Sequence, residues 1–156
     1  MSLISRIFAV IMVLFLPVAT LAEEPILTLT ANGEVKVFDL QAIQAFESTS
    51  FTTTTIWTTG TQTFTGVSLV DFLADYNLDF TSLKATAINS YAIEIPVTDI
   101  VANGAIIAYL KNGRTMSVRE KGPLWIVYPY DSIPDYQSEV IYSRSIWQLD
   151  RLEVQR

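Results

Sequence analysis

The chain has 156 residues, with 16 Asp and Glu against 10 Lys and Arg, so its net charge at pH 7 is −6. An acidic surface repels polyanions, and we therefore expect no nucleic-acid partner. Because the sequence contains neither Cys nor His, it excludes disulfides, thiolate or imidazole metal sites, and Ser-His-Asp or Cys-His nucleophiles.

Residues 1–22 have the composition of a secretory signal. Arg6 precedes an apolar run from Ile7 to Leu16, and small residues up to Ala22 close the segment. The run is shorter than the roughly 20 apolar residues that span a bilayer. We expect a signal peptide at 1–22 and a mature domain at 23–156, located in the periplasm or secreted, with no membrane span after cleavage. The alternative is an uncleaved N-terminal anchor.

The mature domain begins with the pattern of a β-hairpin. Residues Ile26–Thr30 and Val35–Phe38 alternate apolar and polar on either side of Asn32-Gly33, a dipeptide typical of tight hairpin turns. Asp39 follows in a position to cap a short helix. The apolar face of that helix would be Leu40, Ile43 and Phe46.

A threonine-rich segment follows, FTTTTIWTTGTQTFTG at residues 51–66. Its β-branched and aromatic residues predict two strands that turn at Thr59-Gly60 and end at Gly66. Low-complexity disorder is the alternative, but the interspersed aromatic residues argue against it. Ser68, followed three residues later by Asp71, predicts a helix that begins with a capping box.

The second half is again rich in strand patterns. Residues 129–143 form a looser segment with no clear periodicity. The predicted strands are Leu83–Ile88, Tyr91–Ile95, Ala105–Leu110, Met116–Val118, Leu124–Tyr128 and one within Ile146–Val154. The sequence therefore predicts a single β-rich α+β domain.

Four phrases of the chain, in this order, resemble one known family. They are FTGVSLVDFLADYNL, AINSYAIEIPVTDI, IIAYLKNGRTMSVREKGPLWIVYPYD and SRSIWQLDRLEV. The family is the oxidoreductase molybdopterin-binding domain, the fold of sulfite oxidases and related periplasmic molybdenum enzymes. The resemblance covers roughly residues 50–154 and implies a sulfite oxidase-like fold.

The resemblance also implies where a ligand would bind. In the family, the segment after Gly122-Pro123 helps to form the pocket for the pterin cofactor. Seven of the nine Lys and Arg residues after Arg6 lie beyond Leu110. We therefore expect an anionic group of a ligand to bind to residues in this C-terminal part of the chain. The implied ligand-binding residues are Arg119, Lys121, Tyr128, Tyr130, Asp131, Tyr136 and Arg144. The alternative is a core strand with exposed turn charges, each cation pairing with a nearby acid such as Glu120, Asp131 or Glu139.

The chain departs from the family at the metal ligand. Catalytic members hold molybdenum through a cysteine thiolate that precedes a Trp. By that pattern the matching position here falls within Thr52–Thr55, before Trp57, and Thr53 is the favoured candidate. A neutral hydroxyl is a poor replacement for a soft, charged ligand. We therefore expect no molybdenum catalysis, although the resemblance still implies molybdopterin as a cofactor to consider.

These observations favour an exported module that binds an anionic small molecule or a periplasmic protein partner. The alternative is a molybdopterin-dependent oxidoreductase with unusual cofactor ligation. A third hypothesis is a complex-assembly protein with Trp57, Tyr136 and Trp147 as contact residues. Glu94, Asp99, Asp131 and Asp135 are candidate acids or bases, but their spacing is also that of solvated loop carboxylates.

Overall fold

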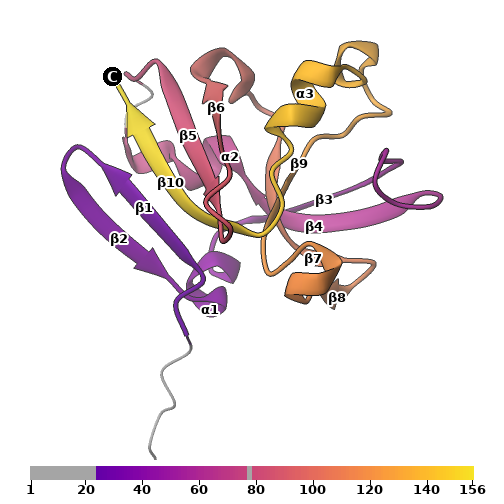
Figure 1. Cartoon of the computed structure of the whole chain (residues 1–156), viewed down its shortest axis with the longest axis horizontal. Coiled ribbons are helices and arrows are strands. Elements are labelled where there is room, and N and C mark those ends of the chain that lie inside the picture. Colours follow the sequence, from indigo (N-terminus) through magenta and orange to yellow (C-terminus); the bar gives the residue numbers. More distant parts are fainter. Residues whose placement is uncertain (1–23, 77–78) are drawn as a thin grey trace, which may run out of the picture.

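The computed structural model describes residues 24–76 and 79–156, and the predicted signal peptide at 1–22 lies outside them. The described residues form two five-stranded β-sheets with a few short helices (Figure 1). This is the mixed, β-rich architecture that the sequence predicts. Within these residues, no helix has the length and apolar character needed to cross a membrane.

The first sheet joins the two ends of the domain. Its strand order is β2-β1-β10-β5-β6, and β1 pairs with β10 in parallel, although they are at opposite ends of the sequence. The predicted Asn32-Gly33 turn is confirmed, because both residues have the positive φ angles of a tight hairpin turn. The strands are β1 (Leu27–Ala31), β2 (Glu34–Phe38), β5 (Ser82–Ala87), β6 (Ala92–Pro96) and β10 (Leu149–Gln155).

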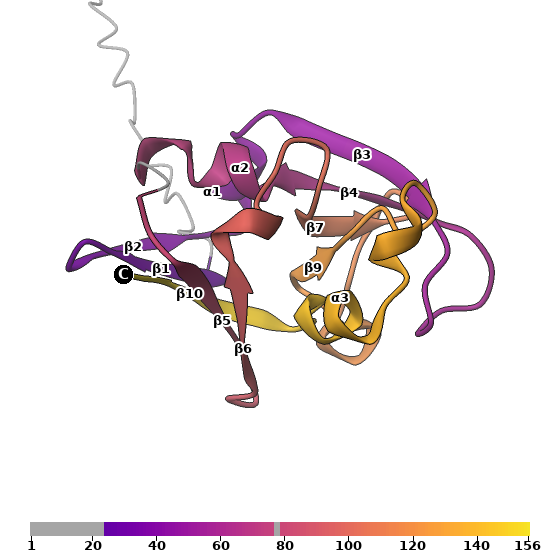
Figure 2. The same cartoon turned by 90° about the horizontal axis from the view of Figure 1, so that it is seen from above.

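The second sheet carries the threonine-rich hairpin and the strand before Tyr128. Its order is β3-β4-β7-β8, and β9 also pairs with β7, along Ile106–Ala108, whereas β8 pairs with Leu110 and Lys111. Figure 2 shows the two sheets as separate groups of strands that meet at an angle. The strands are β3 (Ser48–Thr53), β4 (Gln62–Ser68), β7 (Ile106–Lys111), β8 (Arg114–Thr115) and β9 (Trp125–Val127).

The helices are short and fill the junctions between strands. The Asp39 cap is confirmed, since its carboxylate accepts a hydrogen bond from the Ala42 N–H at 2.7 Å. The α-helices are α1 (Leu40–Gln44), α2 (Leu69–Phe72) and α3 (Glu139–Arg144), and the 3-10 helices are η1 (Ala74–Tyr76), η2 (Val97–Asp99), η3 (Val118–Glu120) and η4 (Pro134–Tyr136). Helix α3 contacts β6 of the first sheet.

The prediction that the hairpin ends at Gly66 is wrong, because Gly66 lies inside β4. A Cβ atom at this position would be 2.1 Å from the carbonyl oxygen of Ile107 on the neighbouring strand. The register between β4 and β7 shifts between Thr65 and Gly66. The glycine therefore permits a close approach of two backbones rather than a turn.

Three other local predictions are wrong. Ser68 precedes α2 but its side chain makes no capping hydrogen bond. Residues 116–118 are not a strand, because Ser117 donates its N–H and its hydroxyl to the Glu120 carboxylate and starts η3 there. The segment 129–143 is more ordered than predicted, since Ser138 caps α3 by accepting from the Ile141 N–H.

Candidate functional site

The three tryptophans of the chain meet in one aromatic cluster. The Trp57 ring centroid lies 5.8 Å from that of Trp125 and 5.6 Å from that of Trp147. Tyr130 and Tyr142 add rings 6.2 and 5.7 Å from Trp57. All four contacts are edge-to-face, an arrangement that aromatic quadrupoles favour. Trp57 is thus the centre of a cluster consisting of Trp57, Trp125, Tyr130, Tyr142 and Trp147.

The loop that carries Trp57 is attached to the segment after β9 by one carboxylate. Asp131 accepts hydrogen bonds from the Thr54 N–H at 2.6 Å and from the Thr54 hydroxyl at 2.7 Å. In return, the Asp131 N–H donates to the Thr53 hydroxyl at 3.1 Å. Both hydrogen bonds from Thr54 lower the pKa of the Asp131 carboxyl, and the bond from the hydroxyl has the larger effect. These bonds give Asp131, a predicted ligand residue, a role in fixing the Trp57 loop.

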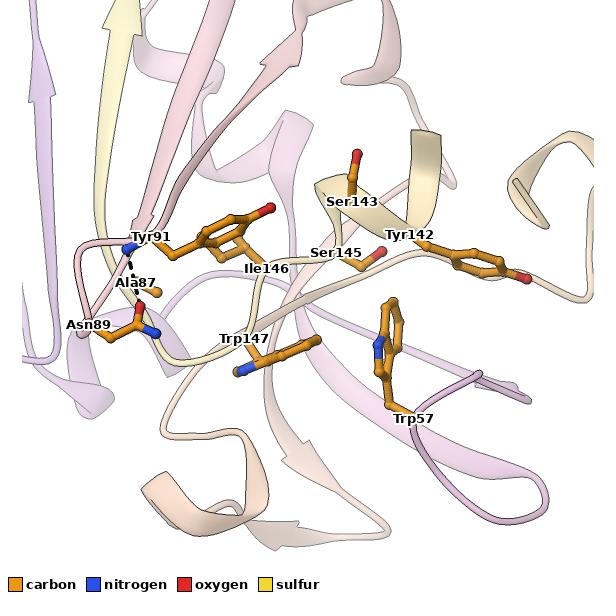
Figure 3. Close-up of a pocket in the computed structure, with 9 residues that line it drawn as sticks. All are labelled: Trp57, Ala87, Asn89, Tyr91, Tyr142, Ser143, Ser145, Ile146 and Trp147. Carbon is orange, nitrogen blue, oxygen red and sulfur yellow. Dashed lines mark hydrogen bonds between the residues drawn. The ribbon is translucent and has the colours of Figure 1, made fainter. Parts of the chain in front are cut away.

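A pocket of about 420 Å³ opens beside the aromatic cluster (Figure 3). Its walls come from the Trp57 loop, the end of β5 with the turn between β5 and β6, and α3 with the segment that leads from it to β10. The nine lining residues are Trp57, Ala87, Asn89, Tyr91, Tyr142, Ser143, Ser145, Ile146 and Trp147. None is charged. The volume suits a small organic ligand, since such sites span roughly 300–1,000 Å³.

The polar groups of the pocket have defined orientations. The Tyr91 N–H donates to Asn89 Oδ1 at 3.1 Å, and Figure 3 shows the Asn89 amide nitrogen turned toward Trp147. The Ser145 hydroxyl accepts from Tyr130 at 2.6 Å and donates to the Ile141 carbonyl at 2.8 Å. Asn89 therefore offers a donor to the pocket, while Ser145 is already engaged with the protein.

Two of the three predicted pocket tyrosines belong to the core. Tyr128 and Tyr130 are 0% and 1% exposed, and burial raises the pKa of both hydroxyls. The Tyr136 ring is half-buried against Tyr128, with 5.5 Å between their centroids, and partial burial raises the pKa of Tyr136 too. Among the described residues, the buried Tyr128 hydroxyl has no hydrogen-bond partner. None of the three lines the pocket described above.

Arg144 forms an ion pair with Asp99, in which its Nη1 contacts Oδ2. Both side chains are about four-fifths buried. The pair attaches the last residue of α3 to η2, which follows β6. Because Ser143 and Ser145 line the pocket on either side of Arg144, this ion pair helps to position one pocket wall.

Arg119 and Lys121 have different surroundings. Arg119 is exposed on η3. The Lys121 ammonium lies 4.2 Å from the centroid of the Trp147 ring and 5.8 Å from that of Trp125. Among the described residues, neither cation has a carboxylate within ion-pair distance. Arg144 has an acidic partner, but it is Asp99 and not one of the nearby acids that the alternative hypothesis names. A ligand role for Arg119 and Lys121 stays a prediction.

The residues at the implied metal position do not fit molybdenum. Thr53 is fully buried at the end of β3. Its hydroxyl donates to the Thr54 carbonyl at 3.2 Å and accepts from the Asp131 N–H. No cysteine exists to supply a thiolate, and the described residues contain no group of three or more His, Cys, Asp or Glu side chains arranged to hold a metal. The donor set is that of a structural hydrogen-bond network.

Sequence analysis missed several residues of the pocket. Asn89 lies in a predicted turn, and nothing in the sequence distinguishes it from an ordinary turn asparagine. Tyr91 lies in the strand predicted at Tyr91–Ile95, and Tyr142 lies in the loose segment predicted at 129–143. The density of aromatic residues between Tyr128 and Trp147 could have indicated Tyr142, although it does not show which rings face a cavity, and no such pattern surrounds Tyr91.

One solved structure with a similar fold is the sulfane dehydrogenase SoxCD from Paracoccus pantotrophus. The TM-score is 0.63 at 18% sequence identity, and the match covers 83% of this chain and 37% of that chain. This chain therefore matches little more than a third of the SoxCD chain. The likeness supports the sulfite oxidase-like fold that the sequence resemblance implies. No protein-family model and no curated protein matches the chain.

Proposed function

We propose that this protein is a small-ligand-binding module that uses a sulfite oxidase-like fold without molybdenum catalysis. The observation that carries the proposal is the pocket beside Trp57, which is walled by two tryptophans and two tyrosines. Predominantly apolar walls with a few oriented polar groups are typical of small-molecule sites. The segment at 1–22, if removed as a signal peptide, would place this binding activity in the periplasm or outside the cell.

The pocket favours a flat, partly apolar ligand. Trp57 and Trp147 offer large rigid surfaces, and Trp, Tyr and Phe rings bind planar groups with little loss of side-chain entropy. The Asn89 amide nitrogen provides an oriented donor at one side. A ligand with a ring and a hydrogen-bond acceptor would satisfy both features.

The oxidoreductase alternative has less support from the site. Soft thiolate or imidazole ligands are absent from the sequence, and the Thr53 hydroxyl is committed to backbone partners. None of the nine lining residues carries a carboxylate, an amine or an imidazole, which leaves the hydroxyls of Tyr91 and Tyr142 as the only titratable groups of the lining. Binding, rather than turnover, is the activity that these side chains support.

The proposal is tested by screening planar aromatic compounds against the purified domain by thermal shift and ligand-observed NMR. Tyr91→Ala removes a pocket wall whose residue is 54% exposed, so folding should be retained while affinity for each hit falls about fivefold or more. Val140→Ala is the control, because Val140 is equally exposed and does not line the pocket. Equal binding by the parent and Tyr91→Ala across all hits would contradict the proposal.

A further inference from the structure

We propose, building on the ligand-binding function above, that the pocket selects planar aromatic anions and that Lys121 supplies the positive charge from behind the Trp147 indole. Lys121 does not line the pocket, whereas Trp147 does. The Lys121 ammonium nevertheless lies 4.2 Å from the Trp147 ring centroid. The ammonium therefore contacts a ring of the pocket wall without lining the cavity itself.

Lys121 is held in place by its backbone. It ends η3 in the left-handed conformation, with φ of 77°. Its carbonyl accepts from the Gln148 N–H at 2.9 Å, and the Gln148 side-chain amide donates to the Val118 carbonyl at 2.8 Å. Gln148 directly follows Trp147, so these bonds couple the position of the cation to that of the ring.

The electrostatic consequence depends on the sign of the ligand charge. A ring stacked on the pocket side of Trp147, at a van der Waals separation of about 3.5 Å, would have the ammonium roughly 8 Å away. Since no lining residue is charged, no acid within the pocket lining offsets this field. We estimate that it favours an anion over a neutral isostere by about tenfold in affinity, after allowance for solvent screening.

The hydrogen-bonding groups of the pocket point to the same ligand class. Indole nitrogens only donate, and among the described residues neither Trp57 nor Trp147 donates its Nε1–H to a protein acceptor. The Asn89 amide nitrogen is a third donor, and the bond that the Asn89 oxygen accepts from the Tyr91 N–H sets its orientation. An aromatic carboxylate would use these donors, whereas an aromatic amine would not.

A cationic ligand is the opposite possibility, because aromatic faces also attract cations. Here that attraction is already used by Lys121, whose ammonium lies over both Trp147 and Trp125. A second cation on the other face of Trp147 would be repelled by the first. The cluster therefore disfavours quaternary ammonium ligands.

The test compares naphthoate with its neutral isostere naphthamide by isothermal titration calorimetry at low salt. We expect the parent protein to bind naphthoate about tenfold more tightly. Lys121→Met keeps the length of the side chain and should lower naphthoate affinity to that of naphthamide, leaving naphthamide affinity in place. Lys121→Arg should retain the preference. Arg114→Met removes a positive charge from an exposed position on β8 that does not line the pocket, and it is the matched control.

The outcomes separate this inference from the proposed function. If both probes bind, Tyr91→Ala weakens both, and Lys121→Met leaves their ratio unchanged, the pocket binds ligands but Lys121 does not select charge. If Arg114→Met lowers the ratio as much as Lys121→Met, the preference comes from general surface charge and the inference also fails. If neither probe binds, the proposed function and this inference both fail for planar aromatic ligands.

Discussion

Asp131 holds Thr54 through two hydrogen bonds, of 2.6 and 2.7 Å, although 77 residues separate them in the sequence. The bonds reach a backbone N–H and a hydroxyl of the same residue, so they fix both the position and the direction of the chain at the end of β3. Trp57 follows three residues later, at the centre of the aromatic cluster. The carboxylate therefore connects the C-terminal half of the domain to one pocket wall.

Asp131→Asn should weaken this connection. The variant loses the charge that strengthens both hydrogen bonds, and we expect the free energy of unfolding to fall by about 1 kcal/mol at neutral pH. The folded-state pKa of Asp131 is lowered, so its contribution is present above the unfolded value of about 4 and is lost as pH falls through the folded pKa. The difference between the two proteins in urea denaturation should thus shrink below about pH 4.

Asp135→Asn serves as the control for this experiment, because Asp135 is exposed and its carboxylate makes no hydrogen bond within the described residues. An equal loss of stability in both variants, or a difference that persists unchanged into acid, would show that Asp131 does not act through Thr54.

The ion pair between Arg144 and Asp99 predicts an asymmetric mutational response. Asp99→Asn leaves a largely buried guanidinium without its counter-charge, and we expect a loss of about 2 kcal/mol in the free energy of unfolding. Asp99→Leu combined with Arg144→Met removes both charges and should recover part of that loss. Additive losses in the double-mutant cycle of Asp99→Leu, Arg144→Met and their combination, measured by urea denaturation, would contradict coupling between the two side chains.

Sequence reasoning predicted features that depend on neighbouring residues. The Asn32-Gly33 hairpin and the Asp39 cap are set by local backbone preferences, and both were identified from two or three residues. The meeting of Trp57, Trp125 and Trp147 was not predicted, because it depends on how β3, β9 and β10 are placed by long-range pairing. The parallel contact between β1 and β10 has the same origin. Local patterns therefore identify elements, whereas the site arises from their three-dimensional arrangement.

Gly66 should be among the least replaceable residues of the second sheet. In Gly66→Ala, the new Cβ would meet the Ile107 carbonyl oxygen at 2.1 Å, so β4 and β7 would have to separate. We expect a loss of about 3 kcal/mol in thermal or urea unfolding. Gly60→Ala is a useful comparison, since a Cβ at this position would meet nothing within 4 Å. The backbone of Gly60 has a positive φ, and this conformation costs a residue with a side chain about 1–2 kcal/mol. A smaller effect at Gly66 than at Gly60 would contradict the close approach.

The export prediction concerns residues outside those that the structure describes. If Arg6, the apolar run and the small residues up to Ala22 act as a signal peptide, mass spectrometry of the protein from its native host should find Glu23 as the first residue. A soluble cytoplasmic product that retains Met1 would contradict export. Retention of the segment in a membrane fraction would instead favour the uncleaved anchor.

The metal prediction follows from the chemistry of Thr53. Its hydroxyl is buried, neutral and hydrogen-bonded to backbone groups, whereas molybdenum in the resembling family is held by a thiolate. We expect elemental analysis, after expression in a host that makes the cofactor, to find far less than one molybdenum per chain. About one molybdenum per chain would overturn the proposal and favour the oxidoreductase alternative. Thr53→Cys tests the position separately: a gain of metal in this variant, but not in a Thr52→Cys control on the exposed face of β3, would identify Thr53 as the equivalent of the missing ligand.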